Sequence, residues 1–453
     1  MDLTAQLRRA SFAQPHLLVV AAPGAVETRL AVERYARERG WPAAESAADA
    51  DVLAVVGFPD AGLASVVAVL ESQIPAPWTS VDLRDPGSVT TELDAVPARL
   101  ANWSPQPSAA GNGHGHGGHN EHGGHNEHGG HNEHGGHNEH GGHQGQAVRP
   151  IDTEHGQREP DGDHGMAGHG MAGHGMGGHD MSGGHGGHEH HMGAVAGLSM
   201  AGRAADRDGL KLDVLHVPLG PVLPYWPAGL RLSLAVQGDV VQDVTVATVG
   251  VDGAGSSFWD EPVLRALAGE RVSAGEIARR RAASHLDSLV RLLGVAGWDG
   301  PALRCAVLRD RALAGEPAGP LTETFRPLGR RLARSWVLRR MTDGLGELDG
   351  RACYRAGISG PAAIAAGDVW ARLQQWVRST GDDLARLDDR SPVTDVEGPR
   401  GRLDWAEPPT VALLGVLPRL LVGAELAGVR VIVASLDPDV AELSAQPAVT
   451  ARG

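Results

Sequence analysis

The feature that most limits how this chain of 453 residues can fold is a long segment, residues 110–195, built largely of glycine and histidine. The hexapeptide GGHNEH occurs four times between residues 117 and 140, and pentapeptides of the type GMAGH follow from residue 165. Ordering a backbone costs about 1 to 2 kcal/mol per residue, and almost no aliphatic side chain is present to offset that cost. We therefore predict a disordered linker that separates two folded regions.

The same segment predicts metal binding, because imidazole is the commonest protein ligand for zinc, copper and nickel, and thioether sulfur adds affinity for cuprous copper. Of the 23 histidines, 20 lie between residues 114 and 191, and six of the eight methionines lie between residues 166 and 200. The candidate ligands are His114, His116, His119, His122, His125, His128, His131, His134, His137, His140, His143, His164, His169, His174, His179, His185, His188, His190 and His191.

The expected cofactor is a divalent metal ion, nickel, zinc or copper, since a flexible run of ligands sets no selectivity beyond the general affinity order. Binding should weaken below about pH 6.5, where imidazole becomes protonated. Two purposes stay open. The linker could store or deliver a metal, or it could be a spacer whose metal binding is incidental.

The region before the linker, residues 12–105, alternates short apolar runs with stretches of helical spacing. Runs of four to eight apolar residues bounded by glycine and proline are typical of buried strands. The expected order is strand, helix, strand, helix, strand, at residues 17–22, 26–38, 51–57, 61–72 and 78–83. Alternation of this kind predicts an α/β domain with a small parallel sheet.

The region after the linker, residues 206–445, predicts an α+β domain that starts with a β-hairpin and continues as a helical bundle. Apolar and polar residues alternate on both sides of a turn at residues 238–239. Ser273 and Glu276 form a capping-box pattern at the start of a helix that should end near Gly294. Further helices are expected at residues 301–313, 321–345 and 362–384, and residues 411–423 and 429–434 close the region, the latter as a buried strand.

Composition excludes several classes of function. A net charge of -15 argues against nucleic-acid binding, which needs a basic surface. Two cysteines are too few for a disulfide framework, a thiolate zinc site or an iron-sulfur cluster, and they indicate a reducing compartment. No run of about 18 apolar residues is present, so no transmembrane helix is expected, and the apolar run near the start is too short for a signal peptide.

Several motifs after the linker resemble the catalytic large subunit of respiratory complex I, the 49-kDa or D subunit of NADH-quinone oxidoreductase, which is related to the nickel-iron hydrogenase large subunit. The landmarks occur in the order of that family and cover roughly residues 212–445. They are Gly220-Pro221 with Gly229-Leu230-Arg231-Leu232, His285-Leu286-Asp287, Gly357-Ile358-Ser359-Gly360-Pro361, Glu397-Gly398-Pro399-Arg400-Gly401, and Ser435-Leu436-Asp437-Pro438.

The region before the linker resembles the small B subunit of the same complex. The matching segments are residues 51–57 and 73–78, together with Ala25-Val26-Glu27, which matches the residues after the cysteine pair of that family. The chain therefore resembles a fusion of two subunits that face one another in the parent complex.

The ligands that this resemblance implies are missing. Pro23-Gly24 stands where the small subunit carries two cysteines for a four-iron cluster, and no cysteine precedes Cys305. Leu223 and Pro227 stand where the D-subunit motif has histidines, the second of which serves the quinone headgroup. Asp439 stands where hydrogenases have a nickel ligand. We expect no iron-sulfur cluster, while quinone binding stays open.

The candidate catalytic residues are Tyr225, His285, Glu397, Arg400 and Asp437. For each of them a structural role competes with a functional one. Glu397 and Arg400 could position a redox site, but we favour a fold-holding ion pair. Asp437 fits a turn, and His285 fits a partly buried residue with satisfied hydrogen bonds. Cys305 and Cys353 are expected to be buried small apolar side chains.

Three functions follow, in order of preference. The first is a redox-degenerate subunit of a complex-I-like or hydrogenase-like assembly with integral membrane partners, with the chain in the cytoplasm or on the inner face of the cell membrane. The second is a nickel, zinc or copper storage or delivery protein. The third is an active quinone-reducing oxidoreductase subunit that takes electrons from another protein.

Overall fold

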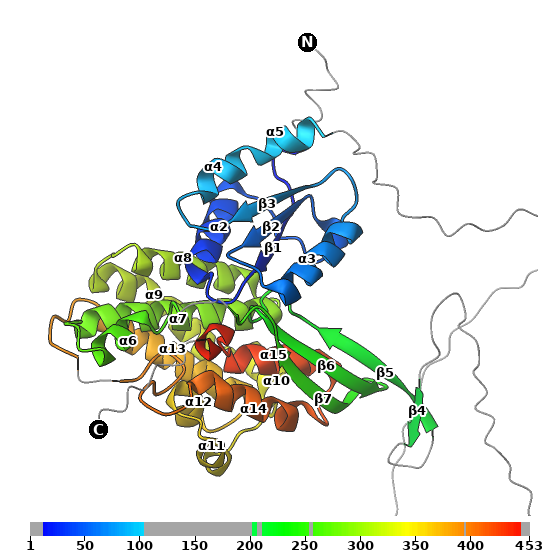
Figure 1. The fold of residues 1–453 in the computed structure, drawn as a ribbon. Helices are drawn as coiled ribbons and strands as arrows, with labels where there is room; N and C mark the ends of the chain where they lie inside the picture. The colour runs from blue at the N-terminus through cyan, green and yellow to red at the C-terminus, as the bar shows by residue number, and fades with distance from the viewer. Residues whose placement is uncertain (1–11, 104–201, 206–210, 253–256, 394–395, 445–453) are drawn as a thin grey trace, which may run out of the picture. The chain divides into compact units, whose positions relative to one another are not determined.

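The computed structural model describes residues 12–103, 202–205, 211–252, 257–393 and 396–444 (Figure 1). The histidine-rich linker and all of its candidate metal ligands lie outside these residues, so the linker remains a prediction. Residues 1–107 and 193–453 belong to one compact unit. The domain boundaries expected at residues 105 and 206 also stay predictions.

The region before the linker contains the predicted parallel sheet, with strand order β1 (Leu17–Ala21), β2 (Val52–Val56), β3 (Thr79–Leu83). Helices cover both faces of this sheet (Figure 1). The elements on one face are α2 (Val26–Arg39), α4 (Val89–Asp94) and α5 (Val96–Ala101), and those on the other are η1 (Ala47–Asp49) and α3 (Ala61–Gln73).

Both faces of the central strand are buried, which explains the unbroken apolar run that predicted it. Val52, Ala54 and Val56 pack toward α2, whereas Leu53 and Val55 pack toward α3. The α/β prediction for this region is therefore confirmed.

A second sheet follows the linker, and it is antiparallel with the order β4 (Gly202–Ala205), β5 (Lys211–Leu219), β6 (Leu230–Gln237), β7 (Val240–Thr248). The predicted two-residue turn joins β6 to β7. The apolar positions of β6, which alternate with more exposed ones, enter the core of the helical bundle. The hairpin thus forms one wall of that core.

The helical bundle is organised around α7 (Ala274–Val295), which is buried along most of its length and packs against α8, α13 and α15. The Ser273 side chain accepts a hydrogen bond from the Glu276 amide at 3.2 Å, so the predicted N-cap is confirmed. The remaining elements are α6 (Glu261–Leu267), α8 (Asp299–Leu313), α9 (Ala318–Ala333), α10 (Trp336–Thr342), α11 (Gly350–Ala356), α12 (Gly360–Ala365), α13 (Val369–Ala385), α14 (Pro409–Leu421), α15 (Leu426–Leu436) and η2 (Val440–Leu443).

The prediction of a buried strand at residues 429–434 is wrong, because these residues lie within helix α15. A short apolar run cannot distinguish a strand from a helix that is buried on several sides. Two of the expected long helices are each divided in two, since Ser335 caps α10 and Asp368 caps α13. These caps interrupt the helical pattern that the sequence alone presents as continuous.

Within the described part of the chain, no helix combines the length and the hydropathy that crossing a membrane requires.

Candidate functional site

The two folded regions contact one another through a cluster of buried charges between α2 and the bundle helices α7 and α8. Its centre is Asp287, whose side chain is only 2% exposed. Arg29 of α2 donates to Asp287 Oδ2 at 2.8 Å, Arg309 of α8 donates to Oδ1 at 2.5 Å, and Arg291 lies 3.3 Å from Oδ2. Burial opposes ionisation of Asp287, yet the arginines outweigh it and hold its pKa well below the ordinary value.

Further ion pairs surround this centre. Glu33 of α2 pairs with Arg29 and lies 3.0 Å from Arg309 Nη1. Asp310 pairs with Arg37 of α2 and lies 3.0 Å from Arg309 Nε. Residues 29, 33 and 37 recur at intervals of four, so one face of α2 carries all of these contacts. Charges buried in this way are tolerated because each has an opposite partner.

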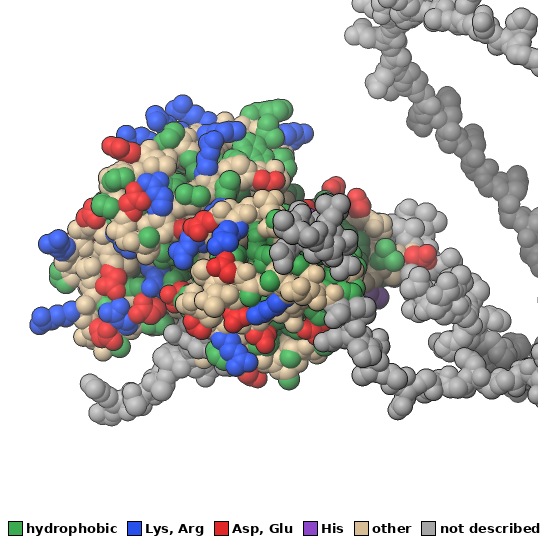
Figure 2. Space-filling model, turned by 90° about the horizontal axis from the view of Figure 1, so that it is seen from above, with side chains coloured by type: hydrophobic (Ala, Val, Ile, Leu, Met, Phe, Trp, Pro, Cys, Tyr) green, Lys and Arg blue, Asp and Glu red, His purple; other side chains and the backbone are tan. Residues whose placement is uncertain are grey.

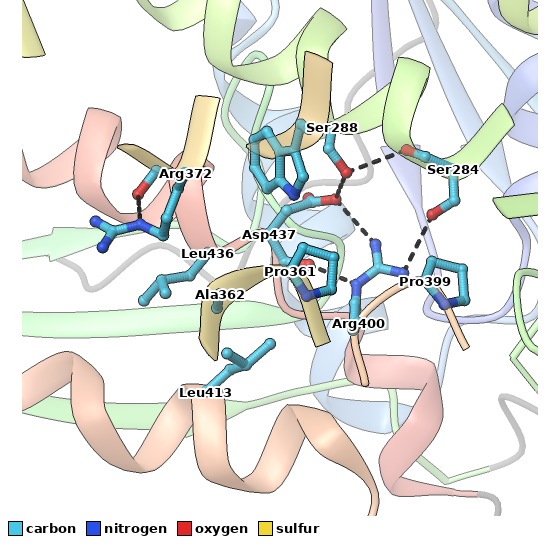
Figure 3. A pocket seen from close by; sticks show the side chains of 12 residues that line it. Ser284, Ser288, Pro361, Ala362, Arg372, Pro399, Arg400, Leu413, Leu436 and Asp437 are labelled. Carbon is cyan, nitrogen blue, oxygen red and sulfur yellow. Dashed lines mark hydrogen bonds and ion pairs between the residues drawn. The ribbon is translucent and has the colours of Figure 1, made fainter. Parts of the chain in front are cut away.

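A second arrangement is built on Asp437, which follows α15 in the left-handed conformation with φ 44°. Arg400 donates from Nε to the Asp437 carbonyl at 2.5 Å and from Nη2 to Oδ2 at 2.9 Å (Figure 3). Arg291 and Ser288 of α7 donate to the same carboxylate, each at 2.6 Å. Arg291 therefore links this arrangement to the Asp287 cluster.

A small cavity adjoins this arrangement, and Ser284, Ser288, Pro399, Arg400 and Asp437 line one side of it (Figure 3). The cavity measures about 10 Å³. One water molecule needs about that much room. A quinone headgroup or a nickel-iron centre does not fit, and no cysteine lines the space.

A second cavity, of about 20 Å³, lies beside the loop that would carry the iron-sulfur ligands. Pro23 of this loop packs against two glycines of the hairpin region. A Cβ on Gly229 would lie 2.5 Å from Pro23 Cγ, and one on Gly250 would lie 2.6 Å from Pro23 Cδ. The remaining cavity is small and the loop has no thiolates, so a four-iron cluster does not fit it.

His285 is buried on α7 between two other elements. Its Nε2 lies 3.2 Å from the Pro399 carbonyl, and its Nδ1 lies 3.5 Å from Asp383 Oδ2 of α13, an ion-pair distance rather than a hydrogen bond. Asp383 also accepts a hydrogen bond from Arg281 at 2.7 Å. Burial opposes ionisation of Asp383, but His285 and Arg281 lower its pKa. These contacts fix His285 within the protein.

Tyr225 lies apart from the other candidates. Its backbone has φ 59°, and its ring packs on α7 at Gly294, where an added Cβ would meet the ring at 2.5 Å. Nine residues of helix separate Gly294 from His285, or roughly 13 Å along the axis. Burial and then the nearby Asp299 raise the pKa of Tyr225. The structure does not join Tyr225 and His285 in one quinone site.

The remaining candidates lie on one loop and at the end of α15. Arg400 forms its ion pair with Asp437 at 2.9 Å. Glu397 pairs through its backbone with Arg402 in an isolated β-bridge. Both cysteines are buried, as expected, and burial raises the pKa of Cys305 to about 12.

Sequence reasoning missed the charged residues that connect the two regions, above all Asp287 and Arg309. A signal was present, because Asp287 and Arg291 are four residues apart within the apolar stripe of α7. A charged pair inside an apolar face indicates a buried partner on another element.

On the face that Figure 2 shows, basic and acidic side chains are interspersed rather than separated into patches.

Comparisons with known proteins cover family models, curated proteins and solved structures. The sequence matches no protein family model. A search of curated proteins finds no match either. Among solved structures, a chain from the membrane-bound sulfane sulfur reductase, an archaeal respiratory membrane complex, is similar with a TM-score of 0.37 and 16% sequence identity. That match covers 51% of this chain and 98% of the other.

Proposed function

We propose that this chain is a subunit of a membrane-associated assembly related to complex I and the nickel-iron hydrogenases, and that it serves there as a structural element without a redox centre of its own. The observation that carries the proposal is the small size of the two cavities beside Arg400. Pro23 packs into the place of the cluster ligands, and the cavity next to Asp437 has room for about one water molecule.

The retained family landmarks have structural roles that support this proposal. A Cβ on Gly360 would lie 2.7 Å from the Arg400 carbonyl, and the Ser359 hydroxyl accepts a hydrogen bond from the Arg402 amide at 2.9 Å. Arg400 in turn binds Asp437. Three landmarks that are far apart in the sequence thus pack on one another, so their retention is explained by the fold and does not require a redox reaction.

The charge cluster at Asp287 supports the same conclusion. Arg29 and Glu33 lie on one face of α2, and Asp287, Arg309 and Asp310 lie on the bundle helices. The ion pairs among these five residues hold the two regions together. In the proposal, these residues form within one chain the contact that two separate subunits would otherwise make. The two regions together then form a platform for other subunits.

Purification from native membranes tests the assembly. An affinity tag on the full chain is expected to bring down integral membrane subunits in fixed proportion, and the isolated chain is expected to contain no iron. A tagged Asp287→Asn chain is the matched variant, since loss of the contact between the regions should reduce recovery of the partners. Recovery of the chain alone, or iron in stoichiometric amount, would contradict the proposal.

Metal storage or delivery is the second candidate, supported by the 20 histidines between residues 114 and 191. Two variants separate it from a spacer role. One deletes residues 114–191, and the other replaces their histidines by serine at unchanged length. If the linker handles metal, both variants should alter metal sensitivity or maturation of a metalloenzyme equally. An effect of the deletion alone would assign the linker a spacer role.

An active quinone reductase is the candidate that the geometry supports least, because Tyr225 and His285 lie apart and Pro227 offers no side-chain donor. Quinone reduction by the purified assembly, compared with the same assembly carrying Tyr225→Phe and His285→Gln, measures it. Activity that depends on either side chain would restore this candidate.

A further inference from the structure

Two carboxyl groups outside the charge cluster are buried with oxygens that accept no hydrogen bond from the described residues. Asp260, which precedes α6, is 1% exposed, and Glu442, in η2, is 2% exposed. Both oxygens of Asp260 and Oε1 of Glu442 have no hydrogen-bond partner among the described residues. A buried carboxylate without donors is among the most costly groups that a folded protein can contain.

The neighbouring polar groups are already engaged. Ser257 donates its single hydroxyl proton to Asp439 at 2.8 Å. The Thr410 amide donates to Glu442 Oε2 at 2.9 Å, which leaves Oε1 without a donor. Arg400, the cation that lowers the pKa of both carboxyl groups, directs its side chain to Asp437. Among the described residues, no hydrogen bond to the Asp260 carboxyl group is found.

Asp260 and Glu442 interact with each other, and both are acceptors when ionised. A hydrogen bond can join them only when one carboxyl group carries a proton. Burial is the largest cause that raises the pKa of Asp260, to about 6, and the charge of Asp439 adds to it while Arg400 opposes it. Burial and then Asp260 raise the pKa of Glu442 well above its ordinary value, again against Arg400.

The surroundings leave no easy way for the pair to separate. Asp260 Oδ1 packs so closely against the backbone of Gly398 that a Cβ atom on residue 398 would clash with it. Glu442 is held by the Thr410 amide at the start of α14. The pair therefore stays together in the folded state, and the like charges that would arise from full ionisation would face one another across a buried contact.

We propose that Asp260 and Glu442 form a proton-binding site, in which one bound proton joins the two carboxyl groups by a hydrogen bond and fastens η2 to the start of α6. A proton is the occupant that the geometry favours over a metal ion, because no group of three or more histidine, cysteine, aspartate or glutamate side chains in the described ranges is arranged to hold one. Loss of this proton weakens the attachment of η2.

Infrared difference spectroscopy of the full chain tests the site directly. A protonated carboxylic acid has a carbonyl band distinct from that of a carboxylate, and we expect such a band at pH 5 that loses intensity as the pH rises through about 6, where Asp260 ionises. Asp260→Asn should remove this loss of intensity and Glu442→Gln should shift the pH at which it occurs, whereas Glu347→Gln, at an exposed position, should leave it unchanged. The same pH dependence in wild type and both variants, or no band in the wild type, would overturn the proposal.

Unfolding by urea at several pH values gives an independent readout that does not require the band. Because the pKa of Asp260 is higher in the folded chain, at about 6, than in the unfolded chain, at about 3.9, the folded state binds an extra proton between these values. Its stabilising effect is complete below about pH 3.9 and is lost as pH rises through 6. Relative to wild type, the urea midpoint of Asp260→Asn should therefore increase with pH over this range.

A midpoint difference that does not change with pH would contradict the proton site even if the variant folds poorly. The same measurement in the presence of sodium, magnesium or zinc ions separates a cation from a proton as the occupant. A metal-dependent rise of the wild-type midpoint that both variants abolish would replace the proton by a metal ion and overturn the proposal as stated.

Discussion

The two groups of buried carboxyls in this protein, at Asp287 and at the pair formed by Asp260 and Glu442, are almost equally inaccessible but are expected to differ in ionisation. Three arginines surround Asp287 and keep its pKa low, whereas three oxygens of the pair have no donor among the described residues and both pKa values are high. Burial alone therefore does not set the charge of a carboxyl group. The donors that the fold directs at it decide the outcome.

The two groups are connected, and this makes the comparison testable. Arg291 contacts both Asp287 and Asp437, and Arg400 contacts Asp437 and also lowers the pKa values of the pair. A change at one group can reach the other through these two arginines.

The largest effect is expected for Asp287→Asn, which leaves arginines buried beside a neutral side chain. Removing one partner of a buried ion pair costs about 3 to 5 kcal/mol. Since the pKa of Asp287 is lowered by folding, its contribution is present above about pH 3.9 and is lost as the pH falls through the folded-state pKa. Urea unfolding at pH 7 and pH 3 measures both; equal stability of variant and wild type at pH 7 would refute the role of the cluster.

The next largest effect is expected for Gly229→Ala. The added methyl group would meet the Val249 carbonyl oxygen and, at 2.5 Å, Pro23 in a backbone with φ 77°, so overpacking and strain combine. We expect a loss of about 2 to 4 kcal/mol in the free energy of unfolding. Gly238→Ala is the matched control for the positive φ, at 61°, because nothing lies within 4 Å of its Cβ. Similar losses for the two variants would show that Pro23 does not fill the space tightly.

A smaller effect of opposite sign is expected for Asp260→Asn at pH 8. The variant removes a buried carboxylate whose ionisation destabilises the folded state, and it introduces an amide that can donate a hydrogen bond to Glu442. We therefore expect the free energy of unfolding to increase by about 1 kcal/mol. Thermal unfolding at pH 8 beside Asp287→Asn compares the two groups directly. Destabilisation of the same size in both variants would erase the distinction between them.

The smallest effect is expected for Arg99→Gln, which removes an exposed ion pair with Glu92 whose members lie 2.9 Å apart. Exposed pairs contribute about 0 to 1 kcal/mol. Urea unfolding in low and high salt should differ little between this variant and the wild type. A loss comparable to that of Asp287→Asn would mean that exposure does not govern the strength of ion pairs in this chain.

The sequence predicted the backbone architecture better than the site. Strands β1 to β3 and helix α7 follow local signals, namely apolar runs bounded by glycine or proline and the Ser273 cap, so their positions could be predicted to within one or two residues. The helix at residues 429–434 was missed because its burial depends on α7 and α13, which no local pattern reveals.

For the site, the sequence named Arg400 and Asp437 as candidates, but their mutual contact joins positions 37 residues apart and could not be derived from spacing. The Asp287 cluster depends on contacts between α2 and α7, 258 positions apart, and the pair of Asp260 and Glu442 depends on where the chain's last helical turn packs. Whether a charged residue is buried depends on how distant elements pack together. Sequence periodicity indicates only on which side of its own helix or strand the residue lies.

The contact of Arg29 with Asp287 has a consequence for how the two regions are produced. Because one polypeptide carries both residues, the two sides are synthesised in equal number, and their encounter does not depend on the cellular concentration of a second protein. Dilution cannot separate them. An interface too weak to hold two separate chains together can therefore persist within this one. Residues at the contact can be substituted as long as every buried charge keeps a partner of opposite charge.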